Sequence, residues 1–403
     1  DVITRVKIFI KMSTNPDNVT VPQITSDSLR NLIDLIASEV HFEDYEIAWK
    51  QQDFTGDNFC GEISRVQIIP RKGNIGQKVL YLFVKTAPTD SISRNALPIH
   101  NFYVAEVFVY TEIIPAFYRL HDECNILKCK EIVILEDLSE DGFIMTDKKS
   151  AFDYDHAALV LQNMARIHAS SFAMKEKHPE QLSKLTDHLP NKITFGEHLL
   201  SLMENVAVTV VTKIVSPENR AKIHPFAGKI RGIFTDLFDS TLSEPYNVVC
   251  HGDSWSNNIL FKYDKPILKL FVFALNTYSS PLADVCYMLC LSTDPNLLNT
   301  HLHQLLDVYY ETLRLSMKEM DCDVEKSFPK DVFMEHFRRF VLLGLSMVLG
   351  IIAFSFRVSG NIKPIGDYDS KEGNNPAKDL QISDLGVERI NGLIDFFVKN
   401  DLL

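Results

Sequence analysis

Residues 248–261 constrain the fold of this chain more than any other part of the sequence. Two short apolar runs, each typical of a buried strand, flank a loop that holds His251, Asp253 and Asn258. Phosphoryl transfer uses such a pair, a carboxylate that orients a hydroxyl nucleophile and a carboxamide that holds a metal on the phosphates. The alternative is a polar turn between two core strands, because Asp, Asn, Ser and Gly are common turn residues. The His-x-Asp-x-x-x-x-Asn spacing favours a kinase catalytic loop over that turn.

The loop sequence HGDSWSNN at residues 251–258 resembles the catalytic loop of the ecdysteroid kinase-like family, a branch of the aminoglycoside and choline phosphotransferase superfamily. A second motif, YSSPLAD at residues 278–284, resembles the family's Tyr-x-Ser-Pro-x-x-Asp and sets the register of the comparison. In that register the metal-binding Asp of the family's Asp-Phe-Gln motif falls on Val272, and its Gln falls on Ala274. The resemblance therefore implies a kinase fold with a metal ligand missing.

The resemblance covers the chain from about residue 29 to the C-terminus and implies an α+β, bilobal, protein-kinase-like fold. We expect an N-terminal extension at residues 1–24 and a small antiparallel-sheet N-lobe at residues 25–138. A large, mainly helical C-lobe follows at residues 139–403, with the catalytic-loop segment at residues 248–284.

Within this family, the residues of the loop have separate implied roles. Asp253 would be the base that orients a hydroxyl, His251 would brace the loop, and Asn258 would be a metal ligand. Asp284 would be a structural partner further along the chain. His168, on a long predicted helix, is more typical of a core or interface histidine than of a catalytic one.

A lysine at the end of an apolar strand gives the second expectation. Residues 79–85 end in Lys85, and burial of a lysine is costly unless a phosphate or a carboxylate meets it. Glu106, on a helix predicted from about residue 98 to 114, is the natural partner. The pair resembles the strand lysine and helix glutamate that position nucleotide phosphates in kinases. The alternative is a surface lysine and a solvated glutamate.

Two further segments resemble nucleotide-contacting parts of the family. A predicted hairpin tip at residues 53–58 contains Gly56 and Asn58, whose backbone donors can lie over phosphates, although the same residues are equally typical of an ordinary turn. The strand at residues 131–138 resembles the hinge between the lobes. Backbone groups near Glu136 and Leu138 would there meet a purine edge.

Two functions of different classes remain open from the sequence. In the first, the kinase fold has lost its chemistry, no cofactor is assigned, and a lipophilic small molecule such as a steroid or a pigment is bound. In the second, an ATP-dependent and Mg²⁺-dependent kinase phosphorylates a hydroxyl of a lipophilic compound, with a displaced acid such as Asp264 serving the metal. The absence of a carboxylate at Val272 favours the first. A protein-binding scaffold is a third alternative, which no exposed motif supports.

Composition limits partners and location. The 403 residues carry a formal net charge of -12, which argues against a nucleic acid or an anionic membrane as partner. The seven cysteines are an odd number without paired zinc-ligand spacing, which favours a reducing, cytoplasmic location. The uncharged residues 340–356 are too short and too interrupted for a membrane span and predict a buried helix. Met12 resembles a natural start, so residues 1–11 are expected to carry no fold information.

Overall fold

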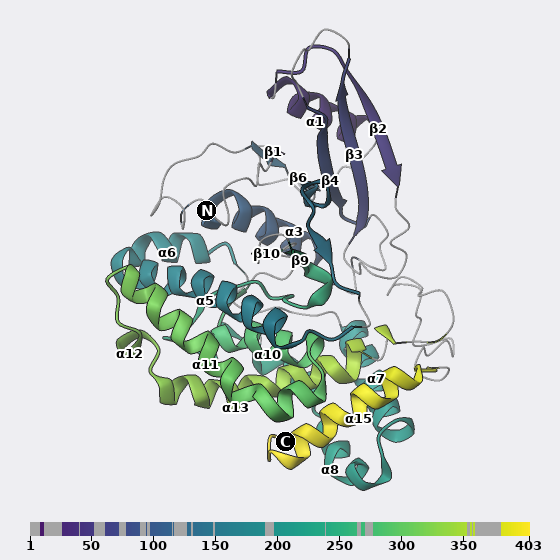
Figure 1. The fold of residues 1–403 in the computed structure, drawn as a ribbon, viewed down its shortest axis with the longest axis vertical. Helices are drawn as coiled ribbons and strands as arrows, with labels where there is room; N and C mark the ends of the chain where they lie inside the picture. Colours follow the sequence, from purple (N-terminus) through teal and green to yellow (C-terminus); the bar gives the residue numbers. More distant parts are fainter. Residues whose placement is uncertain are drawn as a thin grey trace.

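The computed structural model has two lobes of different composition (Figure 1). It describes residues 9–11, 26–39, 41–51, 61–71, 78–88, 94, 97–114, 116, 127–129, 132–147, 150–189, 197–237, 239–263, 267–270, 277–352, 355–356, 358 and 380–403. A four-stranded sheet with helix α1 stands at one end of the molecule, and the helices of the C-lobe fill the other end. The expected α+β bilobal kinase-like fold is confirmed.

The N-lobe sheet is antiparallel throughout, with the strand order β2-β3-β4-β6. Its strands and the neighbouring helices are β2 (Tyr45–Gln51), β3 (Glu62–Pro70), β4 (Leu80–Thr86), β6 (Ile132–Glu136), α1 (Ser26–Glu39) and α3 (Ile99–Phe108), which continues into a π-helical turn at Val109–Ile113. The strands predicted at residues 79–85 and 131–138 are present as β4 and β6, and the helix predicted from about residue 98 is present as α3.

The two faces of this sheet are buried in different apolar clusters because side chains alternate along a strand. Val84 packs with Ile33 and Ile36 of α1 in a small cluster. Its neighbour Phe83 belongs to the large cluster, which includes Phe102 of α3 and the C-lobe core. Lys85 shares the face of Phe83, so the alternation directs the lysine toward α3 and the C-lobe.

The C-lobe is built mainly from helices that pack around the pair α5 and α11. Several start at a capping side chain: the side chains of Asp153, Ser280, Asp294 and Ser383 accept hydrogen bonds from N–H groups of the first turn. The helices are α5 (Tyr154–Lys177), α6 (Pro179–Thr186), α7 (Glu197–Lys213), α8 (Pro217–Ala227), α9 (Ile230–Leu237), α10 (Pro281–Ser292), α11 (Pro295–Glu319), α12 (Val324–Ser327), α13 (Lys330–Met347) with a π-helical turn at Val348–Ile352, and α15 (Asp384–Lys399).

Short strands carry the catalytic-loop segment across the top of these helices. Strand β8 (Val248–Cys250) pairs antiparallel with β11 (Thr277–Ser279), and a sheet of order β10-β9-β7 follows the loop. Its strands are β7 (Ile144–Met145), β9 (Ile259–Lys262) and β10 (Ile267–Leu270). The 3-10 turns of this region are Leu138–Asp141, Ser240–Leu242 and Ser256–Asn258. The two buried strands predicted around the loop are therefore β8 and β9.

Two expectations about chain segments have different outcomes. Residues 340–356 are helical and largely buried in their described part, and none of the helices in the described ranges is long and apolar enough to cross a membrane. The expectation that residues 1–11 carry no fold information is wrong for β1 (Phe9–Lys11), which pairs in parallel with β5 (Leu127–Cys129). Backbone pairing of two short strands needs no side-chain pattern, so periodicity could not reveal it.

Candidate functional site

The catalytic-loop carboxylate of Asp253 is held by hydrogen bonds on both of its oxygens. Oδ1 accepts the hydroxyl of Tyr287 at 2.7 Å, and Oδ2 accepts Nδ2 of Asn258 at 2.7 Å. The same Nδ2 donates to the Asp253 carbonyl oxygen at 2.8 Å. Burial raises the pKa of Asp253, and the hydrogen bond from Tyr287 opposes that rise. The two residues implied as base and metal ligand are thus brought together, with a tyrosine that the sequence did not suggest.

His251 lies inside the loop, as expected of a brace. Its Nδ1 accepts the backbone N–H of Asp253 at 3.2 Å, and its side chain is buried. The histidine therefore contacts the backbone of the residue whose carboxylate is the candidate base.

Asp284 fastens the loop to the first turn of α10. Its carboxylate accepts the backbone N–H of His251 at 2.6 Å and that of Gly252 at 2.8 Å. Gly252 has a φ of 78°, a left-handed conformation that favours glycine. The oxygen that accepts the His251 N–H, Oδ2, also lies 3.3 Å from Nε2 of His168, and Nδ1 of His168 lies 2.7 Å from the Tyr309 hydroxyl. His168 is therefore a buried structural histidine that supports Asp284.

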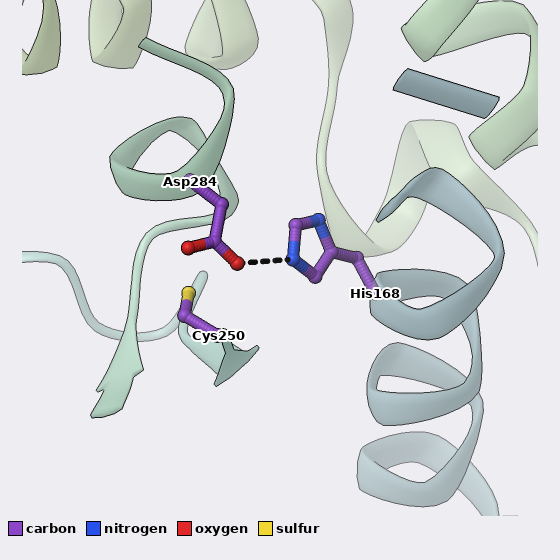
Figure 2. A group of neighbouring side chains, drawn as sticks. All are labelled: His168, Cys250 and Asp284. Atoms are coloured by element: carbon purple, nitrogen blue, oxygen red, sulfur yellow. Dashed lines mark hydrogen bonds and ion pairs between the residues drawn. The ribbon is translucent and has the colours of Figure 1, made fainter. Parts of the chain in front are cut away.

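The ligand atoms of His168, Cys250 and Asp284 lie within 4.8 Å of one another, close enough to resemble a metal site (Figure 2). Both Asp284 oxygens already accept backbone N–H groups, and burial raises the pKa of the Cys250 thiol well above its usual value, which disfavours the thiolate a metal needs. We therefore assign the cluster to support of the loop.

Lys85 and Glu106 form the expected buried ion pair. The distance between Lys85 Nζ and Glu106 Oε2 is 2.8 Å, and each residue is 1% exposed. Oε1 of Glu106 has no hydrogen-bond partner among the described residues. Burial raises the pKa of Glu106, and the charge of Lys85 opposes that rise. The alternative of a surface lysine and a solvated glutamate is excluded.

The segment that the sequence predicts as a hinge lies where β6 ends. Glu136 is the last residue of β6 and pairs with Leu82. Leu138 is buried, begins a 3-10 turn, and its carbonyl oxygen accepts the Phe143 N–H at 3.2 Å. Between them the Asp137 carboxylate lies 3.1 Å from Nε of Arg65 on β3, which ties the hinge to the N-lobe sheet.

Several residues of the expected site lie outside the described residues. These are Gly56 and Asn58 of the hairpin tip, and Val272, Ala274 and Asp264 around the expected metal position.

Comparison with known proteins assigns the chain to a family. Residues 55–322 match the ecdysteroid kinase-like family. The chain belongs to this family. Among curated proteins, none matches the chain.

Three solved structures that resemble this family member are distant from it in sequence. An ethanolamine kinase of Plasmodium vivax has 9% identity and a TM-score of 0.43 over 96% of this chain and 98% of its own. A choline/ethanolamine kinase family protein of Mesorhizobium loti has 11% identity and a TM-score of 0.38, over 91% and 99%. A type I macrolide 2'-phosphotransferase has 12% identity and a TM-score of 0.37, over 82% and 93%. These likenesses say nothing about the ligand of this chain.

Kinases bind ATP and Mg²⁺, so membership of a kinase-like family raises the question of whether the residues of this site fit these two groups. Lys85 could meet a phosphate. For magnesium, which prefers several hard oxygen ligands, the described part of the loop offers the carboxamide oxygen of Asn258 beside an Asp253 whose two oxygens are already hydrogen-bonded. The described residues therefore do not by themselves fit a magnesium–nucleotide complex.

Proposed function

We propose that this member of the ecdysteroid kinase-like family keeps the kinase fold, is impaired in phosphoryl transfer, and binds an apolar or amphipathic small molecule between its lobes or within the C-lobe. The observation that carries the proposal is the pair Val272 and Ala274, where the family has Asp and Gln. Their alignment depends on residues 278–284. The pairing of Thr277 with Cys250, which directly precedes the loop, supports that alignment.

The physical argument starts from the metal. A valine side chain offers no oxygen to magnesium, and a metal on the phosphates commonly contributes several kcal/mol to phosphoryl transfer. Two polar side chains of the loop, Asp253 and Asn258, are hydrogen-bonded to each other. An apolar side chain at Val272 instead suits a pocket of the kind that holds lipophilic ligands.

Native mass spectrometry and an absorption spectrum of protein purified from its source test the proposal. We expect a stoichiometric apolar small molecule and no retained nucleotide or magnesium. In a thermal-shift assay, Mg-ATP is expected to change the unfolding temperature little, because a ligand stabilises the native state only if it binds to it. Purified protein that carries no small molecule and is strongly stabilised by Mg-ATP would contradict the proposal.

A restored metal position gives a sharper test. The double substitution Val272→Asp with Ala274→Gln is expected to create stabilisation by Mg-ATP that the original chain lacks. The matched control, Val272→Asn with Ala274→Gln, has the same shape without the charge and is expected to gain much less. Equal responses of the two variants would mean that the missing carboxylate is not what limits nucleotide binding.

An active ATP-dependent O-phosphotransferase is the second candidate, and one observation favours it. The buried ion pair between Lys85 and Glu106 supports it, because protein kinases require such a lysine–glutamate pair. Its substrate would be a hydroxyl of a steroid or of another lipophilic molecule. Transfer of the γ-phosphate of ATP to such an alcohol, abolished by Asp253→Asn, would establish this function and overturn the first.

A further inference from the structure

The Lys85 ammonium has a second buried neighbour besides Glu106. Tyr103 lies on α3 three residues before Glu106, so the two side chains share a face of the helix. Lys85 Nζ lies over the Tyr103 ring, 5.2 Å from its centroid, within the range of cation–π contacts. Tyr103 is 0% exposed, so water does not weaken this contact. The lysine is therefore held between a carboxylate and the face of an aromatic ring, both from α3.

The hydroxyl end of Tyr103 approaches the point where the chain enters β3. A Cβ added to Gly61 would meet the Tyr103 hydroxyl oxygen and the Thr86 carbonyl oxygen at separations that real Cβ atoms do not show. Gly61 directly precedes β3, and Thr86 directly follows Lys85 on β4. The tyrosine thus reaches from the lysine to the start of the neighbouring strand, and only a glycine leaves room for it there.

We propose that Tyr103 is a positioning residue of the site, whose ring holds the Lys85 ammonium and whose hydroxyl end sets the spacing between α3 and Gly61. Helix α3, the end of β4 and the start of β3 then move as one unit. Any ligand that displaces α3 shifts the lysine and the strand entry together. This inference goes beyond the proposed function, because it concerns the placement of Lys85 and not the molecule that Lys85 meets.

A purely structural role is the alternative, in which Tyr103 only fills volume. Two substitutions separate the roles, because Tyr103→Phe keeps the ring face over Lys85 whereas Tyr103→Leu removes it. The readout is the rate at which Lys85 is acylated by a limiting amine-reactive ester, measured on its peptide by mass spectrometry and normalised to the other lysines. The control for general loosening of α3 is Phe102→Leu, which also shortens a buried aromatic side chain but points about 100° away on the helix.

We expect Tyr103→Leu to accelerate acylation of Lys85 about thirtyfold relative to Phe102→Leu, the factor that corresponds to a desolvated cation–π contact. Tyr103→Phe is expected to stay within about twofold of the original protein, so that the conservative variant retains the protection. Equal acceleration in Tyr103→Leu and Phe102→Leu would overturn the proposal. So would acceleration in Tyr103→Phe as large as that in Tyr103→Leu.

A double-mutant cycle tests the contact at Gly61 and does not require Tyr103→Leu to fold. Gly61→Ala is expected to lower the unfolding midpoint in urea, and to lower it less when Tyr103→Phe has removed the hydroxyl. Part of the loss remains, because the Thr86 carbonyl oxygen is still in the way. An identical loss with and without the Tyr103→Phe substitution would show that the hydroxyl does not set this spacing.

Discussion

Removal of the Lys85 charge is the perturbation whose effect follows most directly from the structure. In Lys85→Met the Glu106 carboxylate stays buried without its cation. The side chains of the pair are 2% and 1% exposed, so no screening by solvent reduces their interaction. At 2.8 Å and an effective dielectric constant of about 20, Coulomb's law gives an attraction of about 6 kcal/mol. The desolvation of two ions costs several kcal/mol each, so the pair contributes little net stability, while loss of one partner costs about 3–5 kcal/mol.

The sign of the pH dependence distinguishes an uncompensated carboxylate from a simple packing defect. Burial already raises the pKa of Glu106 above its ordinary value of 4.5, and removal of Lys85 raises that pKa further. A carboxyl whose folded-state pKa is raised contributes stability that is complete below the unfolded pKa and is lost as the pH rises through the folded pKa. The difference in the free energy of unfolding between Lys85→Met and the original protein is therefore expected to be small near pH 4.5 and to increase toward pH 8.

Equilibrium unfolding in urea between pH 4.5 and pH 8 provides the assay. The double substitution Lys85→Met with Glu106→Leu is expected to recover most of the loss, because an apolar pair of similar volume needs no desolvation of charge. Asp307→Asn serves as the control, since it breaks an ion pair with Lys330 of the same 2.8 Å length whose side chains are 71% and 39% exposed, and it should cost about 1 kcal/mol or less. The reasoning is refuted if Lys85→Met costs no more than the control, or if the double variant is as unstable as the sum of its parts.

Three further outcomes follow from the packing of the C-lobe. Asp284→Asn removes the carboxylate that accepts two loop N–H groups, so we expect the free energy of unfolding to fall by about 2–4 kcal/mol and the loop amides to exchange hydrogen faster. Unchanged exchange would contradict the role of Asp284. Burial lowers the pKa of His336 below 6.5, so the stability that this histidine contributes is complete above pH 6.5 and is lost as the pH falls through its folded-state pKa. In His336→Gln the urea midpoint should therefore change less between pH 7 and pH 5 than in the original protein. An unchanged pH dependence of the midpoint would show that His336 is not its cause. Gly344→Ala places a Cβ against the Cys290 sulfur and should lower the free energy of unfolding, measured by calorimetry, by about 1–3 kcal/mol. The control Gly228→Ala, whose added Cβ meets nothing within 4 Å, should lower it less. Equal losses in the two variants would contradict this packing argument.

The parts of the site that the sequence predicted are those with few physical solutions. A lysine at the end of an apolar strand needs an anion, and Glu106 is the carboxylate on the next helix, so the sequence alone predicts the ion pair. The loop of residues 251–258 was found from spacing alone. The structural role of Asp284 was implied by the family resemblance, and His168 was predicted to be a core histidine from its place on a long helix; the structure brings these two side chains into contact.

The parts that the sequence did not predict depend on contacts between distant segments. Tyr287 lies in an apolar stretch of α10 and is typical of a core residue, and only the folded chain shows that its hydroxyl reaches Asp253. Tyr103 is similar, because its neighbours are Lys85 on β4 and Gly61, the residue before β3. A buried tyrosine whose hydroxyl must find a partner is a signal that could have marked both residues as candidates. It does not identify the partner.

The separate apolar cluster beneath α1 has a consequence for how the N-lobe opens. Ile33 and Ile36 of α1 pack only on the face of the sheet that carries Val66 and Val84, within the described part of the N-lobe. Detachment of α1 therefore exposes a small apolar surface while the opposite face, with Lys85, stays packed against α3. In hydrogen exchange under native conditions, amides of α1 should exchange through a local opening of lower free energy than those of β4. The lobe can fray at its outer layer while its inner layer keeps the geometry of the site.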